Sequence, residues 1–177
     1  TNDTNRMSYL ATIRKANNLP DSTKVLITRG KSDFYQFKKV IPAISDAIDV
    51  FKQNGVDPWY AQAILLIESP GKSHTKSVVG ANGPFQLMKA VARKQGLIVN
   101  RYTDERTDIK KSALGASRLL SSICIPYVCA MLDSAHLQYS QNDLWFRLLV
   151  LHAYHAGAGN LAGVIRKINP CEGGISL

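Results

Sequence analysis

One carboxylate in this sequence stands where a proton donor would be useful. The chain has three glutamates, and Glu105 and Glu172 stand among polar residues, whereas Glu68 follows an apolar run at residues 63–67. Apolar neighbours disfavour an ionised carboxylate, and so does the negative end of a helix. Glu68 is therefore a candidate for a carboxylic acid that donates a proton near neutral pH. A helix-terminal glutamate that faces solvent is the alternative, and position alone does not separate the two.

The segment after Glu68 has an unusual charge pattern. Residues 69–83 form a long loop rich in glycine and serine, and a loop of this length is usually functional or disordered. Between Ser69 and Thr103 there is no acidic residue, but there are six basic ones: Lys72, Lys76, Lys89, Arg93, Lys94 and Arg101. A lone acid beside a basic loop suits an anionic polymer. Ordinary glycosidases use two carboxylates, and no local spacing favours Asp57, Asp104 or Asp108 as the second one.

Composition indicates one globular domain with an anionic partner. The chain has 177 residues, is 45% hydrophobic and carries a formal net charge of +9. Its basic residues lack the interleaved aromatic residues of a single-strand nucleic-acid binder, so no nucleic-acid partner is expected. We expect a monomer in which residues 1–50 form an N-terminal extension that packs on a catalytic domain at residues 51–177. No run of 18 apolar residues occurs, so no transmembrane helix is expected.

Helical spacing and helix-ending residues predict an all-α fold. Asp57 and Pro58 give an N-cap and a first helical residue, Gly55 and Gly96 mark helix ends, and Asp108 is a second N-cap. Pro126 is expected to break a helix. The predicted helices span residues 8–17, about 41–54, 58–68, 84–95, 108–124, 127–135, 144–157 and 161–168, and a short strand is expected at 25–28.

Several short patterns imitate binding motifs. Gly-Lys-Ser occurs at residues 30–32 and 71–73, but neither copy has the earlier glycine of a phosphate-binding loop. Residues 157–162 fit a dinucleotide pattern but follow a helix rather than a strand. His152 and His155 lie three residues apart, with no third ligand nearby, so a structural or substrate-contacting role is preferred. No metal and no cofactor is expected.

Three cysteines are too few for a disulfide scaffold. Cys124 and Cys129 flank Pro126, where the chain is expected to turn, so they form one hypothetical disulfide. Cys171 could equally pair with either of them. The expected outcome is one free thiol.

Three motifs together resemble one family. The first motif consists of Glu-Ser at residues 68–69, then Ser77, then GANGPFQLM, and it resembles the signature of lytic murein transglycosylases. A later motif, AYHAGAGNLAGVI, resembles the A-Y-N-A-G motif of the same family. Between them, the D-E-R-x-D segment in GLIVNRYTDERTDIKKSALGASRLL is similar to the membrane-bound D-type branch. The similarity covers about residues 55–170. It identifies the chain as a member of the goose-lysozyme-like group, glycoside hydrolase family 23.

The resemblance implies a lysozyme-like helical domain with a peptidoglycan-binding groove. Its single catalytic acid falls on Glu68, which would protonate the bond between N-acetylmuramic acid and N-acetylglucosamine and then deprotonate the muramoyl 6-hydroxyl, leaving a 1,6-anhydro end. The family's tight turn, groove-lining residues and motif tyrosine supply the substrate-binding residues, which are Ser77, Gly80, Ala81, Gln86, Met88, Tyr154 and His155.

Two positions depart from the family pattern. Pro84 stands where leucine is usual, and His155 replaces the motif asparagine. Imidazole cannot copy the donor–acceptor pair of an amide at the same reach. We therefore expect an altered substrate preference or pH dependence, with His155→Asn changing activity by less than about tenfold, which is roughly 1.4 kcal/mol.

Two other functions compete with this interpretation. A goose-type lysozyme would hydrolyse the same bond with water activated by Asp57 or Asp104, and a non-catalytic module would only bind or assemble on the wall. A peptidoglycan substrate implies the periplasm, the outer membrane or secretion, after removal of a leader, and leaves room for peripheral or lipid-anchored membrane association. A phage or secretion-system origin also fits.

Overall fold

The computed structural model describes residues 3–23, 25, 37–68 and 76–165. It divides the chain into two compact units, Thr1–Phe34 and Tyr35–Leu177. Most of the strand expected at residues 25–28 and the end of the helix expected at 161–168 lie outside the described residues. The expected packing of residues 1–50 on the rest of the chain stays a prediction, and the helix at residues 37–53 belongs to the second unit.

The first unit contains helix α1, Asp3–Ala16. The helix begins five residues earlier than predicted, and its end is closed by Asn18, which has a positive φ of 52°. The backbone N–H of Leu19 donates to the Arg14 carbonyl at 2.9 Å, and the Arg14 side chain donates to the Thr23 carbonyl at 2.9 Å. The residues that follow α1 therefore fold back onto the last turn of the helix.

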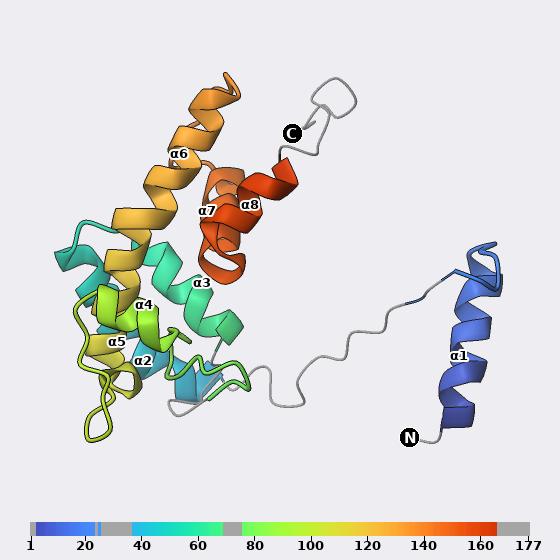
Figure 1. Cartoon of the computed structure of the whole chain (residues 1–177), viewed down its shortest axis with the longest axis horizontal. Coiled ribbons are helices and arrows are strands. Elements are labelled where there is room, and N and C mark those ends of the chain that lie inside the picture. The colour runs from blue at the N-terminus through green and yellow to red at the C-terminus, as the bar shows by residue number, and fades with distance from the viewer. Residues whose placement is uncertain (1–2, 24, 26–36, 69–75, 166–177) are drawn as a thin grey trace. The chain divides into compact units, whose positions relative to one another are not determined.

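The second unit is built from helices, which confirms the predicted all-α class (Figure 1). Its described residues contain no strand, and only isolated bridges join Lys76, Asn82 and Leu87, and Val99 with Asp104. The helices are α2 (Phe37–Gln53), α3 (Pro58–Glu68), α4 (Lys89–Lys94), a 3-10 helix (Glu105–Thr107), α5 (Ile109–Leu119), a π-helix (Leu120–Cys124), α6 (Ile125–Ser134), α7 (Leu144–Ala156) and α8 (Ala158–Ile165).

Local signals set the ends of the central helices as predicted. Gly55 adopts a φ of 66° directly after α2, a conformation that costs glycine little. The Asp57 carboxylate accepts a hydrogen bond from the Trp59 N–H at 2.9 Å, so Asp57 caps α3. Asp108 likewise caps α5 by accepting from the Lys111 N–H at 2.8 Å.

The helix predicted over residues 84–95 is wrong in its first half. Only Lys89–Lys94 is helical, and the preceding residues form tight turns in which Asn82 bridges to both Lys76 and Leu87. The cause is backbone geometry, because Gly83 and Gln86 both have positive φ values, 79° and 46°. A right-handed helix cannot pass through such residues.

Pro126 does not break the helix as predicted. The chain continues from α5 through the π-helix into α6, and Pro126 lies in the first turn of α6 (Figure 1). Proline lacks an N–H and its ring crowds the preceding turn of a regular helix. The wider π-turn directly before it changes the hydrogen-bond register there, which accommodates the ring without a sharp stop.

The continuous helical run Ile109–Ser134 is long and apolar enough to cross a membrane by length and composition alone, with a mean hydropathy of 1.4. The core helix of a folded domain meets the same test. Here the run contacts α2, α4, α7 and α8, and it contributes several residues to the core of the second unit.

The core lies between α2, α3, the α5–α6 run and α7. Phe51 at the end of α2 stacks on Phe85 with ring centroids 5.7 Å apart, so the turn around Phe85 is anchored in the core. The largest fully buried apolar side chains are Phe51, Phe85, Phe146, Ile64, Leu65, Leu120, Val128 and Val150.

The hypothetical Cys124–Cys129 disulfide is wrong, because both cysteines are free thiols on the continuous helix. Five helical residues separate them by about 7.5 Å along the axis, which exceeds the bridging range. Burial also raises the pKa of the Cys124 thiol to about 12.

We therefore expect two free thiols in a Cys171→Ser variant that is denatured and alkylated at once without reductant. In the native variant Cys129, which is partly exposed, should react faster than the buried Cys124. Mass spectrometry of the alkylated protein measures both quantities. A variant without free thiols would contradict the helical separation.

Candidate active site

Glu68 contacts His155 where α3 and α7 end. The His155 Nδ1 lies 2.6 Å from the Glu68 Oε1, and each side chain is 26% exposed. Glu68 is the last residue of α3, and His155 stands in the last turn of α7. The acid expected among apolar neighbours is thus partly open to solvent and paired with an imidazole. Sequence reasoning missed this pair, because no local pattern joins residues so far apart in the chain.

An ion pair lies at the opposite ends of the same helices. The Arg147 guanidinium, one turn into α7, lies 2.6 Å from the Asp57 carboxylate that caps α3. Arg147 also lies over the Trp59 ring at 5.6 Å. Helices α3 and α7 therefore run in the same direction and are joined at both ends. This arrangement sets the register that brings Glu68 to His155.

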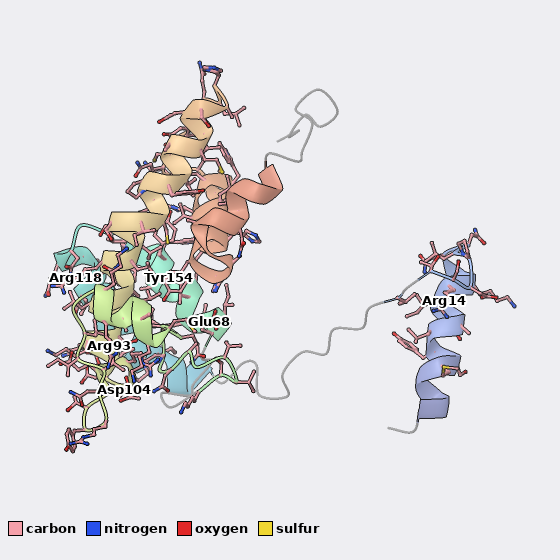
Figure 2. The ribbon with its side chains drawn as sticks, in the orientation of Figure 1. Arg14, Glu68, Arg93, Asp104, Arg118 and Tyr154 are labelled. Carbon is pink, nitrogen blue, oxygen red and sulfur yellow. The ribbon has the colours of Figure 1, made fainter. Side chains whose placement is uncertain are left out.

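Tyr154 links α7 to the turn that contains Phe85. Its hydroxyl donates to the Phe85 carbonyl at 2.7 Å, and its ring packs edge-on against the His155 ring at 5.5 Å. Burial, then the nearby Glu68 charge, raises the pKa of the Tyr154 phenol well above its ordinary value, so the hydroxyl stays a donor. In Figure 2, Tyr154 and Glu68 lie in the same region of the second unit. Among the described residues the Tyr154 hydroxyl bonds to the backbone and not to Glu68.

Ser77 closes a tight turn with Ala81. Its Oγ accepts from the Ala81 N–H at 3.0 Å, and its own N–H donates to the Ala81 carbonyl at 2.9 Å. Gly80, with a φ of 92°, donates its N–H to the Ser77 carbonyl. Ser77, Gly80 and Ala81 therefore build one tight turn, with Val78 and Val79 exposed at its tip.

Gln86 occupies a second tight turn. Both its N–H and its side-chain amide donate to the Gly83 carbonyl, at 3.1 and 2.7 Å, and its φ of 46° is strained for a residue with a side chain. Such strain is characteristic of functional sites. Met88 follows, partly exposed, as the residue that precedes α4. The Ser77 turn and these residues together form one loop at residues 76–88, called the motif loop below.

A buried arginine holds the motif loop in shape. The Arg106 guanidinium donates to both Asp104 carboxylate oxygens at 2.8 and 2.7 Å. It also donates to the carbonyls of Gly80 and Leu87 at 2.9 and 3.0 Å, one near each end of the loop. Asn82, inside the loop, donates to Asp104 at 3.0 Å. The D-E-R-T-D segment thus holds the motif loop in shape. Sequence reasoning missed this role, although the arginine between acidic residues was a signal that could have indicated it.

Three aspartates were considered as a second catalytic carboxylate. Asp57 and Asp104 are paired with arginines, and Asp108 caps α5. Asp57 lies at the far end of α3, roughly 16 Å along the helix axis from Glu68, whereas paired glycosidase carboxylates lie within about 10 Å. Asp104, which is labelled in Figure 2, is the carboxylate bound by Arg106 and Asn82. The hydrogen bond from Arg106 is the main reason that the pKa of Asp104 falls to about 2.

No group of three His, Cys, Asp or Glu side chains that could hold a metal ion occurs in the part of the chain that the structure describes. His152, which was weighed with His155 as a metal ligand, is exposed on α7. The expectation that the protein needs no metal or cofactor stays a prediction.

Gly83→Ala should destabilise the protein much more than Gly80→Ala. Both glycines have a positive φ, so both substitutions carry the backbone cost of about 1 kcal/mol. A Cβ at Gly83 would also meet the Arg106 carbonyl oxygen at 1.7 Å, whereas a Cβ at Gly80 meets nothing within 4 Å. Urea denaturation of the two variants measures the difference, and equal losses would contradict the close approach of Arg106 to the loop.

Asp104→Asn should lower the free energy of unfolding at pH 7 by about 2 kcal/mol, because it leaves a buried guanidinium without its anion. The folded-state pKa of Asp104 is below the unfolded value, so its contribution is present above pH 4 and is lost as the pH falls toward 2. The difference between wild type and variant should shrink over that range. Asp46→Asn, which breaks the exposed pair with Lys110, is the control and should change stability by less than about 0.5 kcal/mol.

Comparison with known proteins agrees with this geometry. A model of the Transglycosylase SLT domain family matches residues 47–169, which is more than half of the chain. No curated protein matches the chain. The matched segment runs from α2 to beyond α8 and includes Glu68, Arg106 and His155. The predicted lysozyme-like all-α fold is thereby confirmed, and the chain belongs to the Transglycosylase SLT domain family.

Proposed function

We propose that the protein is a lytic transglycosylase of peptidoglycan. It cleaves the β-1,4 bond from N-acetylmuramic acid to N-acetylglucosamine and leaves a 1,6-anhydro-muramoyl end. Membership in the transglycosylase family supports the substrate class. The observation that carries the proposal is the pairing of the three carboxylates. Glu68 is partly open and bound to an imidazole, whereas Asp57 and Asp104 are bound by arginines.

A single acid is sufficient for this reaction. The protonated Glu68 donates its proton to the glycosidic oxygen while the bond to the muramoyl anomeric carbon breaks, and the N-acetylglucosamine leaves with a 4-hydroxyl group. The muramoyl 6-oxygen then bonds to the anomeric carbon, and its proton passes to the Glu68 carboxylate. Glu68 ends protonated, as it began, and no water is consumed. The intramolecular nucleophile has the entropic advantage of being held beside the reacting carbon.

The motif loop supplies the proposed glycan contacts. Its turns present backbone groups and the exposed side chains of Val78, Val79 and Met88 on the segment that follows Glu68. We assign substrate binding to Ser77, Gly80, Ala81, Gln86 and Met88, with Tyr154 holding the loop through Phe85. The resemblance of the D-E-R-x-D segment is the ground for proposing a place in the D-type branch of glycoside hydrolase family 23.

The proposed substrate sets the proposed location. Peptidoglycan lies outside the cytoplasm, so we propose that the protein acts in the periplasm, at the outer membrane or after secretion, as a monomer that binds glycan strands. Peripheral or lipid-anchored attachment to a membrane is compatible with this role. The net charge of +9 is compatible with an anionic wall polymer as partner, and the lack of aromatic residues between the basic ones argues against nucleic acid.

Glu68→Gln should lower wall cleavage by at least about a hundredfold and leave the fold intact, because the amide is nearly isosteric but donates no acidic proton. Release of soluble fragments from purified peptidoglycan measures activity, and circular dichroism checks the fold. Glu105→Gln is the charge-matched control. Among the described residues, the Glu105 carboxylate contacts the Ile98 N–H and Lys111, so the control should keep its activity. Wall cleavage near the wild-type rate in Glu68→Gln would remove Glu68 as the acid.

Mass spectrometry of the released fragments should find anhydro-ended muropeptides, each lighter by one water than the hydrolysis product and lacking a reducing end. Fragments with reducing muramic acid would support a goose-type lysozyme, and Asp57 and Asp104 would be the next residues to test. Sedimentation of the protein with the wall without any fragments would support a binding module.

A further inference from the structure

We propose that His155 is a positioning residue that acts through Glu68, rather than a group that contacts the glycan. The proposal rests on the proposed function. Its Nδ1 holds the Glu68 Oε1, which leaves Oε2 to carry the catalytic proton and stabilises the carboxylate that forms when this proton leaves.

The geometry of the contact carries the proposal. A separation of 2.6 Å between Nδ1 and Oε1 is that of a short hydrogen bond. When Glu68 is a carboxylate, such a bond is charge-assisted and roughly twice as strong as a neutral one. In the part of the chain that the structure describes, His155 is the side chain that contacts the Glu68 carboxylate. The imidazole therefore helps to set the orientation of this carboxyl group.

The imidazole is itself held in place. Its ring packs edge-on against Tyr154, whose hydroxyl is bonded to the Phe85 carbonyl. Helix α7 ends directly after the ring, where Gly157 has a φ of 87°. At the other end of α7, Arg147 ties the helix to Asp57 and so to the start of α3. The His155 donor therefore lies at the end of a helix that is itself held in place, and this helix is paired with the helix that carries Glu68.

The two carboxylate oxygens of Glu68 have separate roles, because Oε1 accepts the hydrogen bond from His155 and Oε2 carries the catalytic proton. With the proton of the ring on Nδ1, Oε1 accepts a hydrogen bond throughout the cycle. The proton on Oε2 moves to the glycosidic oxygen, and the proton of the 6-hydroxyl later returns to Oε2. His155 neither gains nor loses a proton overall. Its hydrogen bond strengthens when Glu68 becomes a carboxylate, which favours the step in which the glycosidic bond breaks.

Steady-state kinetics on a soluble glycan fragment of defined length test the proposal. His155→Ala and His155→Phe both remove the donor, and the second keeps a planar ring against Tyr154. Each should lower kcat by about 10- to 100-fold and leave KM within about twofold, because a misplaced acid affects the chemical step and not glycan binding. His155→Asn restores a donor of the family type and should keep kcat within about tenfold. His152→Ala, an exposed histidine of the same helix, should change neither constant.

Chemical rescue separates positioning from a general structural effect. Free imidazole can enter the space left in His155→Ala and should raise its kcat severalfold, whereas it should have no effect on Glu68→Gln or on the His152→Ala control. Melting temperatures of the variants should match the wild type, because His155 lies partly exposed at a helix end.

The outcomes separate failure of this proposal from failure of the proposed function. A raised KM with unchanged kcat in both donor-free variants would make His155 a glycan contact and overturn the proposal, and so would unchanged kinetics. In either case an inactive Glu68→Gln would leave the proposed function standing. An active Glu68→Gln would overturn the proposed function itself.

Discussion

The packing of α3 beside α7, in the same direction, decides where the acid lies. Asp57 and Arg147 join the starts of the two helices, Glu68 and His155 join their ends, and Ile64 and Val150 are buried in the core of the same unit. Helices have a constant rise per residue, so a contact at one end sets which side chains meet at the other. A slip of one residue in α7 would turn His155 away from Glu68 by about 100°.

The motif loop depends on a different constraint, which is the burial of one charge. A guanidinium removed from water requires acceptors, and Arg106 finds them on Asp104 and on the loop carbonyls of Gly80 and Leu87. A loop without regular hydrogen bonding thereby gains a defined shape. The Gly83 turn lies directly against the Arg106 backbone, so the loop and the D-E-R-T-D segment form one packed structure. Tyr154 then connects this structure to the end of α7.

The substitution of the family asparagine by His155 changes the immediate partner of the acid. An amide and an imidazole can both donate one hydrogen bond to a carboxylate oxygen, so the arrangement of the site is compatible with either residue. The imidazole is larger and packs on Tyr154, which couples the acid to the motif loop through Phe85. The residue that sequence comparison marks as a departure is therefore the one that contacts Glu68.

The sequence by itself determined the features that depend on neighbouring residues. The caps at Asp57 and Asp108, the turn at Gly55 and the end of α3 at Glu68 follow from local side-chain and backbone chemistry, and the three motifs identified the family. Tertiary structure alone decided the remainder: the His155 contact, the acceptors of Arg106, the non-helical turns before α4 and the unbroken helix through Pro126. These features depend on which distant segments pack together. A local pattern specifies what a side chain can bind, and only the packed fold decides what lies within its reach.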